Sequence, residues 1–219
     1  MSVQFDLFGP VPRFERFGDL EAALQALTGD PLEAEGGRIV VFRGDPTARV
    51  LIVGEAPGAE EDRLGRPFVG KSGKLLDAIL ASVGFDPAVD VFVTNSVFRR
   101  PRDNRKPTTE EIEWYRPWLM EIIRLIDPPI VLLTGAVALQ SVLDERRGIT
   151  KVRGEWFDWQ GRQVMPIFHP AYLLRNPSSE PGSPKRLMWD DIRTVRAAFD
   201  ARAAATPRVE DGAPLPGDP

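Results

Sequence analysis

The sequence has no cysteine and only one histidine, His169, among its 219 residues. The absence of cysteine excludes disulfides, thiolate metal sites and cysteine nucleophiles. A single histidine makes a zinc site improbable as well, because zinc in proteins takes several histidine or cysteine ligands. We therefore expect no metal and no cofactor.

The sequence also lacks long apolar runs and an excess of positive charge. No uncharged apolar stretch reaches about 18 residues, and the first residues have neither the basic nor the apolar region of a signal peptide. The net charge is −4, so binding to nucleic acid would need a local basic patch. These features favour a soluble, cytoplasmic protein without a membrane partner, which we expect to be a monomer.

Composition and length favour a single domain over residues 1–200, followed by a disordered tail at 203–219 that is rich in Ala, Pro, Gly and Asp. Four short apolar runs predict strands at 49–53, 91–94, 130–134 and 164–168. Helical periodicity fills the intervals, and Thr108 with Glu111 has the pattern of a capping box. Segments near 153–159 and 162–168 predict a hairpin. The alternation predicts an α/β fold, a three-layer αβα sandwich around a central, mostly parallel four-stranded sheet.

Polar residues follow the predicted strands at the points where they end. Glu55 follows the first strand in a loop that also carries Glu61, Asn95 ends the second, Thr134-Gly135 turns the third into a helix, and His169 follows the fourth. Carboxyl ends of parallel strands share one edge of a sheet, where ligands bind. An Asn side chain suits the edge of a nucleobase, a His can donate to a developing anion, and a carboxylate can orient water. Each residue alone has a structural explanation, but together they predict an active site.

Four segments in this chain resemble the thermophile-type (family 4) uracil-DNA glycosylases, in the order and spacing of that family. They are 54–62 (GEAPGAEED), 65–73 (GRPFVGKSG), 94–95 (TN) and 168–177 (FHPAYLLRNP), and the resemblance runs from about residue 38 to 199. It implies a monofunctional enzyme that hydrolyses the N-glycosidic bond of deoxyuridine in DNA and so initiates base excision repair. The base would have to be flipped out of a duplex to be reached.

The resemblance also implies roles for single residues. Phe68 would stack on the flipped uracil, Asn95 would read its O4/N3 edge, and His169 would hydrogen-bond O2 and stabilise the leaving anion. Glu55 and Glu61 match the two active-site carboxylates of the family. One would position water, Glu61 could also crowd C5 against thymine, and the division between them stays open. The expected catalytic set is Glu55, Glu61 and His169, and the uracil-binding set is Gly54, Ala56, Phe68, Asn95 and His169.

Two segments are predicted to contact DNA. Residues 171–176 resemble a loop that wedges into the duplex, with Leu174 and Arg175 filling the vacated stack. The densest basic cluster, at 99–106, follows the Asn95 strand and would contact phosphates, although a solvated loop is the alternative. The expected DNA-binding residues are Lys71, Arg99, Arg100, Arg102, Arg105, Leu174, Arg175 and Lys185.

The chain departs from the resembling family in one respect. Those enzymes carry a four-iron cluster on four cysteines, and rough alignment places at these positions Thr28, Pro31, Arg99 and Trp114. A cluster is therefore not expected. An aromatic packing cluster would fill the space instead, formed by Trp114, Tyr115 and Trp118.

The segment from Gly65 to Ser72 also fits the P-loop pattern of nucleotide triphosphatases. Carboxylates precede it, Pro67 removes an amide and Phe68 is bulky, so we disfavour this interpretation. Amides near Gly70 could still hold a DNA phosphate, assisted by Lys71.

The same motifs allow a different target base or a different activity. The target could be hypoxanthine or thymine mispaired with guanine, or the chain could bind lesions without catalysis. Within an extended peptide at 1–15, residues 4–8 (QFDLF) resemble peptides that bind the bacterial sliding clamp. Packing of these apolar residues on the chain's own domain is the alternative.

Overall fold

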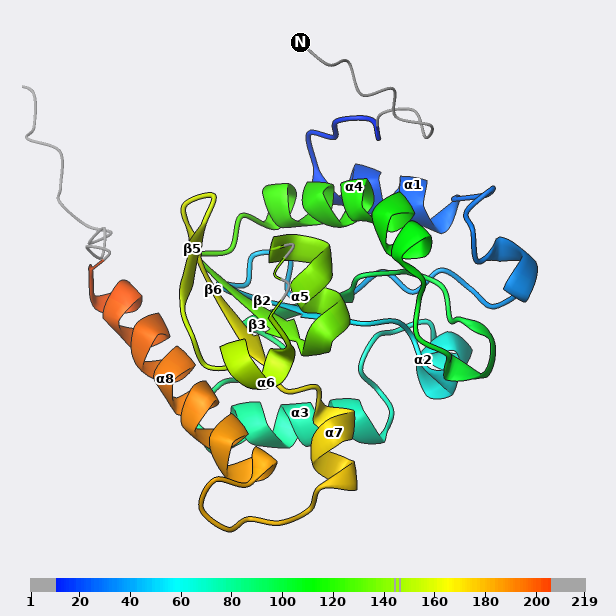
Figure 1. Cartoon of the computed structure of the whole chain (residues 1–219). Coiled ribbons are helices and arrows are strands. Elements are labelled where there is room, and N and C mark those ends of the chain that lie inside the picture. The colour runs from blue at the N-terminus through cyan, green and yellow to red at the C-terminus, as the bar shows by residue number, and fades with distance from the viewer. Residues whose placement is uncertain (1–10, 144, 146, 206–219) are drawn as a thin grey trace, which may run out of the picture.

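The computed structural model describes residues 11–143, 145 and 147–205 (Figure 1). One sheet of six strands has the order β1-β3-β2-β4-β6-β5. Its four central strands are parallel: β2 (Val50–Gly54), β3 (Val91–Asn95), β4 (Ile130–Thr134) and β6 (Arg162–Ile167). They are the four strands that the sequence predicts. The edge strands β1 (Arg43–Gly44) and β5 (Phe157–Trp159) are antiparallel to their neighbours.

The sheet is therefore mixed and six-stranded, and the prediction of four strands was wrong in number. β1 has only two residues, which is too short for an apolar pattern to show. β5 belongs to the predicted hairpin, which is confirmed. Its turn at Gln160 and Gly161 has positive φ at both residues (49° and 78°), as a type I′ hairpin turn requires.

Helices cover both faces of the sheet, which makes the three layers. On one face pack α1 (Phe17–Gln25), α4 (Thr109–Ile126), α5 (Gly135–Leu143) and α6 (Ile149–Val152). On the other pack α3 (Lys71–Ser82), α7 (Pro170–Arg175) and α8 (Pro184–Ala205) (Figure 1). The short helices α2 (Ala59–Leu64), η1 (Glu33–Glu35) and η2 (Arg102–Asn104) lie in connections.

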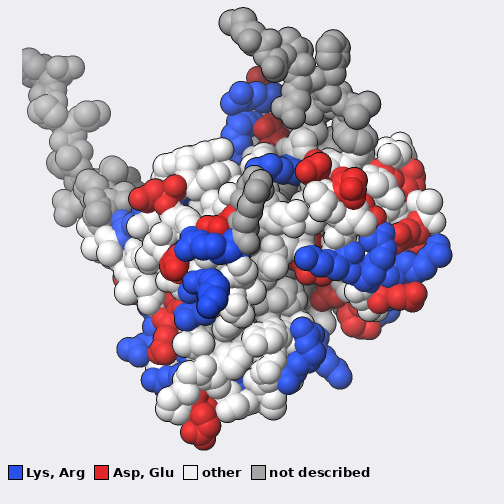
Figure 2. Space-filling model, viewed as in Figure 1, with Lys and Arg blue, Asp and Glu red and all other residues white. Residues whose placement is uncertain are grey.

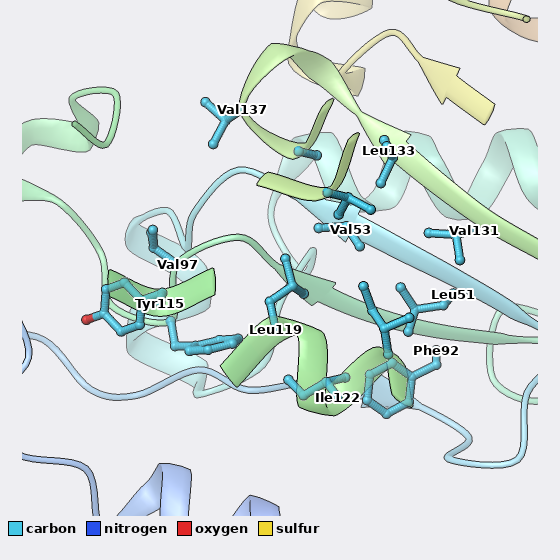
Figure 3. Close-up of a cluster of buried hydrophobic side chains, with 14 of the residues drawn as sticks. Leu51, Val53, Phe92, Val97, Tyr115, Leu119, Ile122, Val131, Leu133 and Val137 are labelled. Atoms are coloured by element: carbon cyan, nitrogen blue, oxygen red, sulfur yellow. The ribbon is translucent and has the colours of Figure 1, made fainter. Parts of the chain in front are cut away.

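Side chains of the central strands alternate between these two apolar layers. Leu51, Val53 and Phe92 join the cluster beneath α4 and α5 (Figure 3), whereas Val50 and Ile52 join the cluster beneath α3 and α8. Every residue of β2, β3 and β4 is buried, as parallel strands covered on both faces must be. This double burial explains why those strands read as continuous apolar runs.

The start of α4 confirms the predicted capping box. The Glu111 amide donates to Thr108 Oγ1 at 3.2 Å, and the Thr108 amide donates to Glu111 Oε2 at 2.8 Å. At the other end of the chain, α8 continues to Ala205, so the first residues of the predicted tail are helical. The rest of the tail and the 4–8 peptide lie outside the described residues. None of the helices that the structure describes is long and apolar enough to cross a membrane.

Candidate functional site

The carboxyl ends of the parallel strands meet at one edge of the sheet, as the sequence predicts. Gly54 and Asn95 are paired in register at the ends of β2 and β3. A cavity of about 330 Å³ opens at this edge. Its lining includes five predicted site residues, Ala56, Glu61, Phe68, Lys71 and His169. It also includes Ser72 and Asn104, for which the sequence predicts no role.

Asn95 is buried (1% exposed), and neither Nδ2 nor Oδ1 has a hydrogen-bond partner in the described part of the chain. Its neighbours hold the strand end in place: Thr94 Oγ1 donates to the Val41 carbonyl at 2.7 Å, and Ser96 Oγ donates to the Gly54 carbonyl at 2.8 Å. Buried polar atoms are nearly always paired. The unsatisfied carboxamide therefore indicates a ligand that offers one acceptor and one donor.

His169 follows β6 and precedes α7, where its side chain caps the helix. Its Nδ1 accepts a hydrogen bond from the Ala171 amide at 3.1 Å, so in the neutral ring the proton lies on Nε2. Burial and, secondarily, the charge of Arg175 lower the pKa of His169 to about 4, against an opposing effect of Glu61. At neutral pH the imidazole is therefore an uncharged Nε2–H donor.

Glu55 lies next to Gly54 at the end of β2. Burial raises the pKa of its carboxyl, and the charges of Lys106 and Arg175 partly oppose that shift. No side chain or amide of the described residues donates a hydrogen bond to this carboxylate, so it is available to a water molecule. Lys106 belongs to the predicted basic cluster, but its effect on Glu55 depends on tertiary placement and has no signal in the sequence.

Glu61, by contrast, is held by the backbone. Its Oε1 accepts from the amides of Val69 at 3.0 Å and Gly70 at 2.8 Å. These two amides are therefore engaged within the protein, and phosphate binding by other amides near Gly70 stays a prediction. Phe68 precedes them with φ = 52° and 6% exposure, and its ring centroid lies 5.8 Å from that of His169.

Arg99 does not face solvent, and its prediction as a DNA ligand was wrong. The side chain is buried, and Nε lies 2.7 Å from Asp30 Oδ2. Its other nitrogens donate to the carbonyls of Gly37 at 2.8 Å and Leu27 at 3.0 Å. A run of arginines in a sequence does not reveal which member turns inward to satisfy a buried carboxylate.

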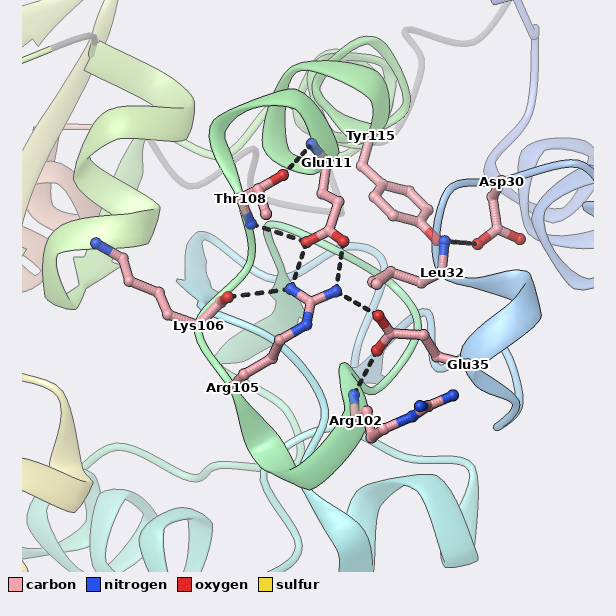
Figure 4. Close-up of polar contacts among 9 residues, drawn as sticks. All are labelled: Asp30, Leu32, Glu35, Arg102, Arg105, Lys106, Thr108, Glu111 and Tyr115. Atoms are coloured by element: carbon pink, nitrogen blue, oxygen red, sulfur yellow. Dashed lines mark hydrogen bonds and ion pairs between the residues drawn. The ribbon is translucent and has the colours of Figure 1, made fainter.

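Arg105 is also engaged within the protein, so its contacts do not support the predicted role in DNA binding, which stays a prediction. Its guanidinium donates to Glu111 Oε1 and Oε2 at 2.6 and 2.9 Å and to Glu35 Oε1 at 2.5 Å (Figure 4). Glu35 also accepts from the amide of Arg102 at 2.5 Å. These contacts fasten the 99–106 loop to η1 and α4, which leaves Arg100, Arg102 and Lys106 as its outer cations.

The positions aligned with the family's cysteines do not fit a metal cluster. Arg99 is paired with Asp30, whose carboxylate also accepts from the Tyr115 hydroxyl and from the Leu32 amide at 3.2 Å. Trp114 packs edge-on against Tyr115, with ring centroids 4.9 Å apart. The predicted aromatic rings therefore occupy only part of the region in which related enzymes would hold the cluster. A buried polar network holds this region, and neither the arginine nor the aromatic rings can ligate iron.

The remaining predicted DNA contacts lie on three helices, and one of them, Lys71, lines the cavity. Leu174 is 45% exposed on α7, and the charge of the adjacent Arg175 acts on both Glu55 and His169. Lys71 begins α3 at the cavity wall, and Lys185 lies in the first turn of α8. Figure 2 shows that basic side chains on the visible face are interspersed with acidic ones rather than forming one continuous patch.

Comparison with known proteins gives a consistent result. Residues 41–193 match the uracil DNA glycosylase superfamily. A type-4 uracil-DNA glycosylase of Thermotoga maritima is 41% identical over 172 residues, which cover 78% of this chain and 88% of the relative. One of Sulfurisphaera tokodaii is 35% identical over 161 residues (70% and 71%). A type-5 uracil-DNA glycosylase of Pyrobaculum aerophilum is 33% identical over 183 residues (75% and 77%).

Proposed function

The chain belongs to the uracil-DNA glycosylase superfamily, and from this membership we propose that it is a uracil-DNA glycosylase that hydrolyses the bond between uracil and deoxyribose in DNA. The observation that supports this function best is the buried carboxamide of Asn95, which has neither a donor nor an acceptor partner among the described residues. The N3–H and O4 groups of uracil supply one donor and one acceptor side by side. Uracil would satisfy both atoms in the same plane.

The neighbouring side chains suit the same ligand. A base flipped out of the duplex would stack on Phe68 at the cavity wall. His169 would donate from Nε2 to O2 of uracil, where negative charge develops as the bond to C1′ breaks. Because the pKa of His169 is lowered to about 4, the ring acts as a neutral hydrogen-bond donor and need not transfer its proton.

The contacts of the two carboxylates support different roles. Glu55 has no protein hydrogen-bond donor among the described residues, so we assign it to the water molecule. Water would attack C1′, its proton would pass to Glu55, and the electrons of the C1′–N1 bond would remain on uracil. Glu61 is fixed by two amides and lines the cavity, so we assign it to shaping the pocket, including crowding at C5.

DNA binding is proposed for the outward cations and the exposed tip of α7. The set is Lys71, Arg100, Arg102, Leu174, Arg175 and Lys185, with Lys106 added for its proximity to Glu55. A duplex would place phosphates along the cations and Leu174 in the vacated stack. Single-stranded DNA would use the same cations.

A sliding clamp is proposed as a second partner, on the sequence of residues 4–8 alone. The described chain is fastened to α4 through Phe14, whose amide donates to Glu121 Oε1 at 2.8 Å and whose carbonyl accepts from Arg124 at 2.5 Å. Glu121 lies twelve helical residues, about 18 Å, from the start of α4. The N-terminal segment is therefore attached away from the 99–106 loop that is proposed to contact DNA. Loss of capture on immobilised clamp after deletion of residues 1–9, with uracil release unchanged, would support the proposal; unchanged capture would reject it.

The decisive experiment measures base release from a labelled oligonucleotide that contains one uracil, with parallel strands carrying hypoxanthine or a G·T mismatch. We expect cleavage of the uracil strand only, and only after alkali, which marks a monofunctional enzyme. Asn95→Asp keeps the shape but replaces the amide donor, so release should fall by about 10²-fold or more while circular dichroism stays unchanged. Binding of uracil-containing DNA without cleavage of any strand would favour a lesion-binding protein instead.

A further inference from the structure

Phe68 has a backbone conformation that bulky residues rarely adopt. Its φ is +52°, in the left-handed region, and its ring is buried at the cavity wall. A conformation of this kind persists only where the surrounding structure enforces it. Two glycines lie against Phe68, one at its backbone and one at its ring.

We propose that Gly73 and Gly54 are positioning residues of this site, because the space left by their missing side chains sets where the Phe68 ring lies against uracil. The inference rests on the proposed function, since it names the groups that define the width of the uracil slot. It concerns the contacts that these two glycines make with the aromatic wall.

Gly73 lies in the first turn of α3, with ordinary helical backbone, so the constraint there is space rather than φ. A methyl group at this position would lie 2.6 Å from Phe68 Cα and nearer still to its carbonyl carbon and oxygen. Backbone cannot rotate out of such a contact in the way that a flexible side chain can. Any side chain at residue 73 must therefore push Phe68 away from α3.

Gly54, at the end of β2, contacts the ring of Phe68 rather than its backbone. A methyl group there would lie 2.7 Å from Phe68 Cζ and closer still to Phe68 Cε2 and to Asn95 Oδ1. The ring of Phe68 and the carboxamide of Asn95 thus both lie where a side chain of residue 54 would be. The separation between the stacking wall and the edge-reading group depends on residue 54 having no side chain.

Glu61 completes the support, because its carboxylate binds the two amides that directly follow Phe68. Together these contacts give the glycine-rich 65–73 segment a role that needs no nucleotide. The segment whose sequence resembles a P-loop serves here to hold the ring of Phe68 in place.

A double-mutant cycle tests the proposal. Gly73→Ala and Gly54→Ala are each made in the wild type and in Phe68→Ala, and kcat/KM for uracil release is measured. Gly18→Ala in α1 is the matched control, because a methyl group there meets no atom within 4 Å. We expect each pocket glycine variant to lose about 10²-fold, the effect of a displacement of about 1 Å, and the control to lose nothing.

In the Phe68→Ala background, Gly73→Ala should cost less than about threefold, because the ring through which it acts is gone. Gly54→Ala should keep the part of its loss that comes from its contact with Asn95 Oδ1. A Gly73→Ala loss that simply multiplies with that of Phe68→Ala would overturn the proposal. Inhibition by free uracil should weaken in Gly73→Ala, whereas binding of undamaged DNA should not change. A variant whose DNA binding falls instead would show that Gly73 acts on the DNA surface, contrary to the proposal.

A folding measurement separates this inference from the proposed function. If Gly73→Ala does not fold, Phe68→Gly should restore folding in the double variant, because glycine tolerates the left-handed backbone and lets the loop shift. A double variant that stays unfolded would overturn the contact argument. This arm uses no substrate. Absence of uracil release by the wild type would reject the function and leave the packing result intact.

Discussion

The imidazole of His169 and the carboxylate of Glu55 lie at the same edge of the sheet, and burial moves their pKa values in opposite directions. The pKa of His169 falls to about 4, whereas that of Glu55 rises above its usual range. Both shifts favour the uncharged form, as removal of water from an ionisable group does. The consequence is that the carboxylate, and not the imidazole, should limit activity in mild acid.

The pH profile of kcat/KM should therefore show an acid limb with its midpoint above 4.5 and no inflection near 6.5. Protonation of Glu55 removes the acceptor for the proton of water, and Glu55→Gln should lower the rate by about 10²–10⁴-fold and abolish the limb. The measurement is single-turnover uracil release from about pH 3.5 to 9, a range that contains the limb expected for Glu55 and any inflection near 6.5. An inflection near the ordinary histidine pKa that disappears in His169→Gln would contradict the assignment.

The shifted pKa of His169 also predicts a pH dependence of stability. The unfolded chain binds a proton on this residue near pH 6.5, whereas the native chain does so near 4. Its contribution to stability is therefore complete above 6.5 and is lost as the pH falls from 6.5 toward 4. In urea unfolding over this window, wild type should lose more stability than His169→Gln. Parallel losses in the two proteins would show that the native imidazole titrates normally.

Among individual residues, those that follow predicted strands could be placed from the sequence, and those that turn inward from a loop could not. Asn95 and His169 are positioned by strand ends, whose apolar runs are visible. Arg99 and Arg105 are indistinguishable in sequence from the cations beside them, because their roles depend on Asp30, Glu35 and Glu111 in remote segments.

At the scale of elements, the 99–106 loop carries cations that bind other parts of the protein and cations that lie on its outer side. Arg105 holds the loop to η1 and α4, while Arg100 and Arg102 lie on its outer side. Asp103 and Asn104 both have positive φ (56° and 55°), and Asn104 reaches the cavity lining. The bend at these two residues places Asn104 in the wall of the cavity.

Substitutions within this loop should separate binding from folding. Arg100→Ala with Arg102→Ala should weaken DNA binding and reduce the slope of log K against log salt by about 0.9 for each lost phosphate contact, with thermal stability unchanged. Fluorescence anisotropy at several salt concentrations measures the slope. An unchanged slope would transfer the phosphate contacts to Lys71, Arg175 and Lys185.

Arg105→Ala is the matched comparison from the same loop. It leaves two carboxylates without their shared cation, so we expect a loss of about 1–2 kcal/mol in the free energy of unfolding, tempered by the one-third exposure of the guanidinium. Urea denaturation measures it. A variant as stable as the wild type but with the reduced salt slope would show that Arg105 does bind DNA.

The elements differ in how far the sequence could predict them. Strands buried on both faces and helices with an apolar stripe are encoded by many residues, so their periodicity survives local exceptions. β1 pairs through two residues, and its existence depends on β3 being present beside it. An edge strand as short as β1 depends on its tertiary partner, which is why the sequence did not predict it, whereas β5 was predicted as part of a hairpin but was not counted in the sheet.

For the whole molecule, one edge of the sheet carries the chemistry while the layers behind it carry the stability. The two apolar clusters lie on opposite faces of the sheet. The carboxyl edge of the sheet instead holds an unsatisfied carboxamide, and the aromatic residue with left-handed backbone lies beside it. The sequence identifies the layers through periodicity and the edge through strand ends. The width of the cavity depends on contacts between segments and was not predictable.

The buried contact between Asp30 and Arg99 joins two segments that are 69 positions apart in the sequence, and it is made entirely by amino-acid side chains. This contact forms by folding alone, without an added metal. Cells starved of iron, or stressed with peroxide, should accumulate this protein with undiminished specific activity, and chelators should leave its melting temperature unchanged. On the proposed function, release of uracil from DNA would then continue in conditions where an enzyme that depends on an iron cluster loses activity.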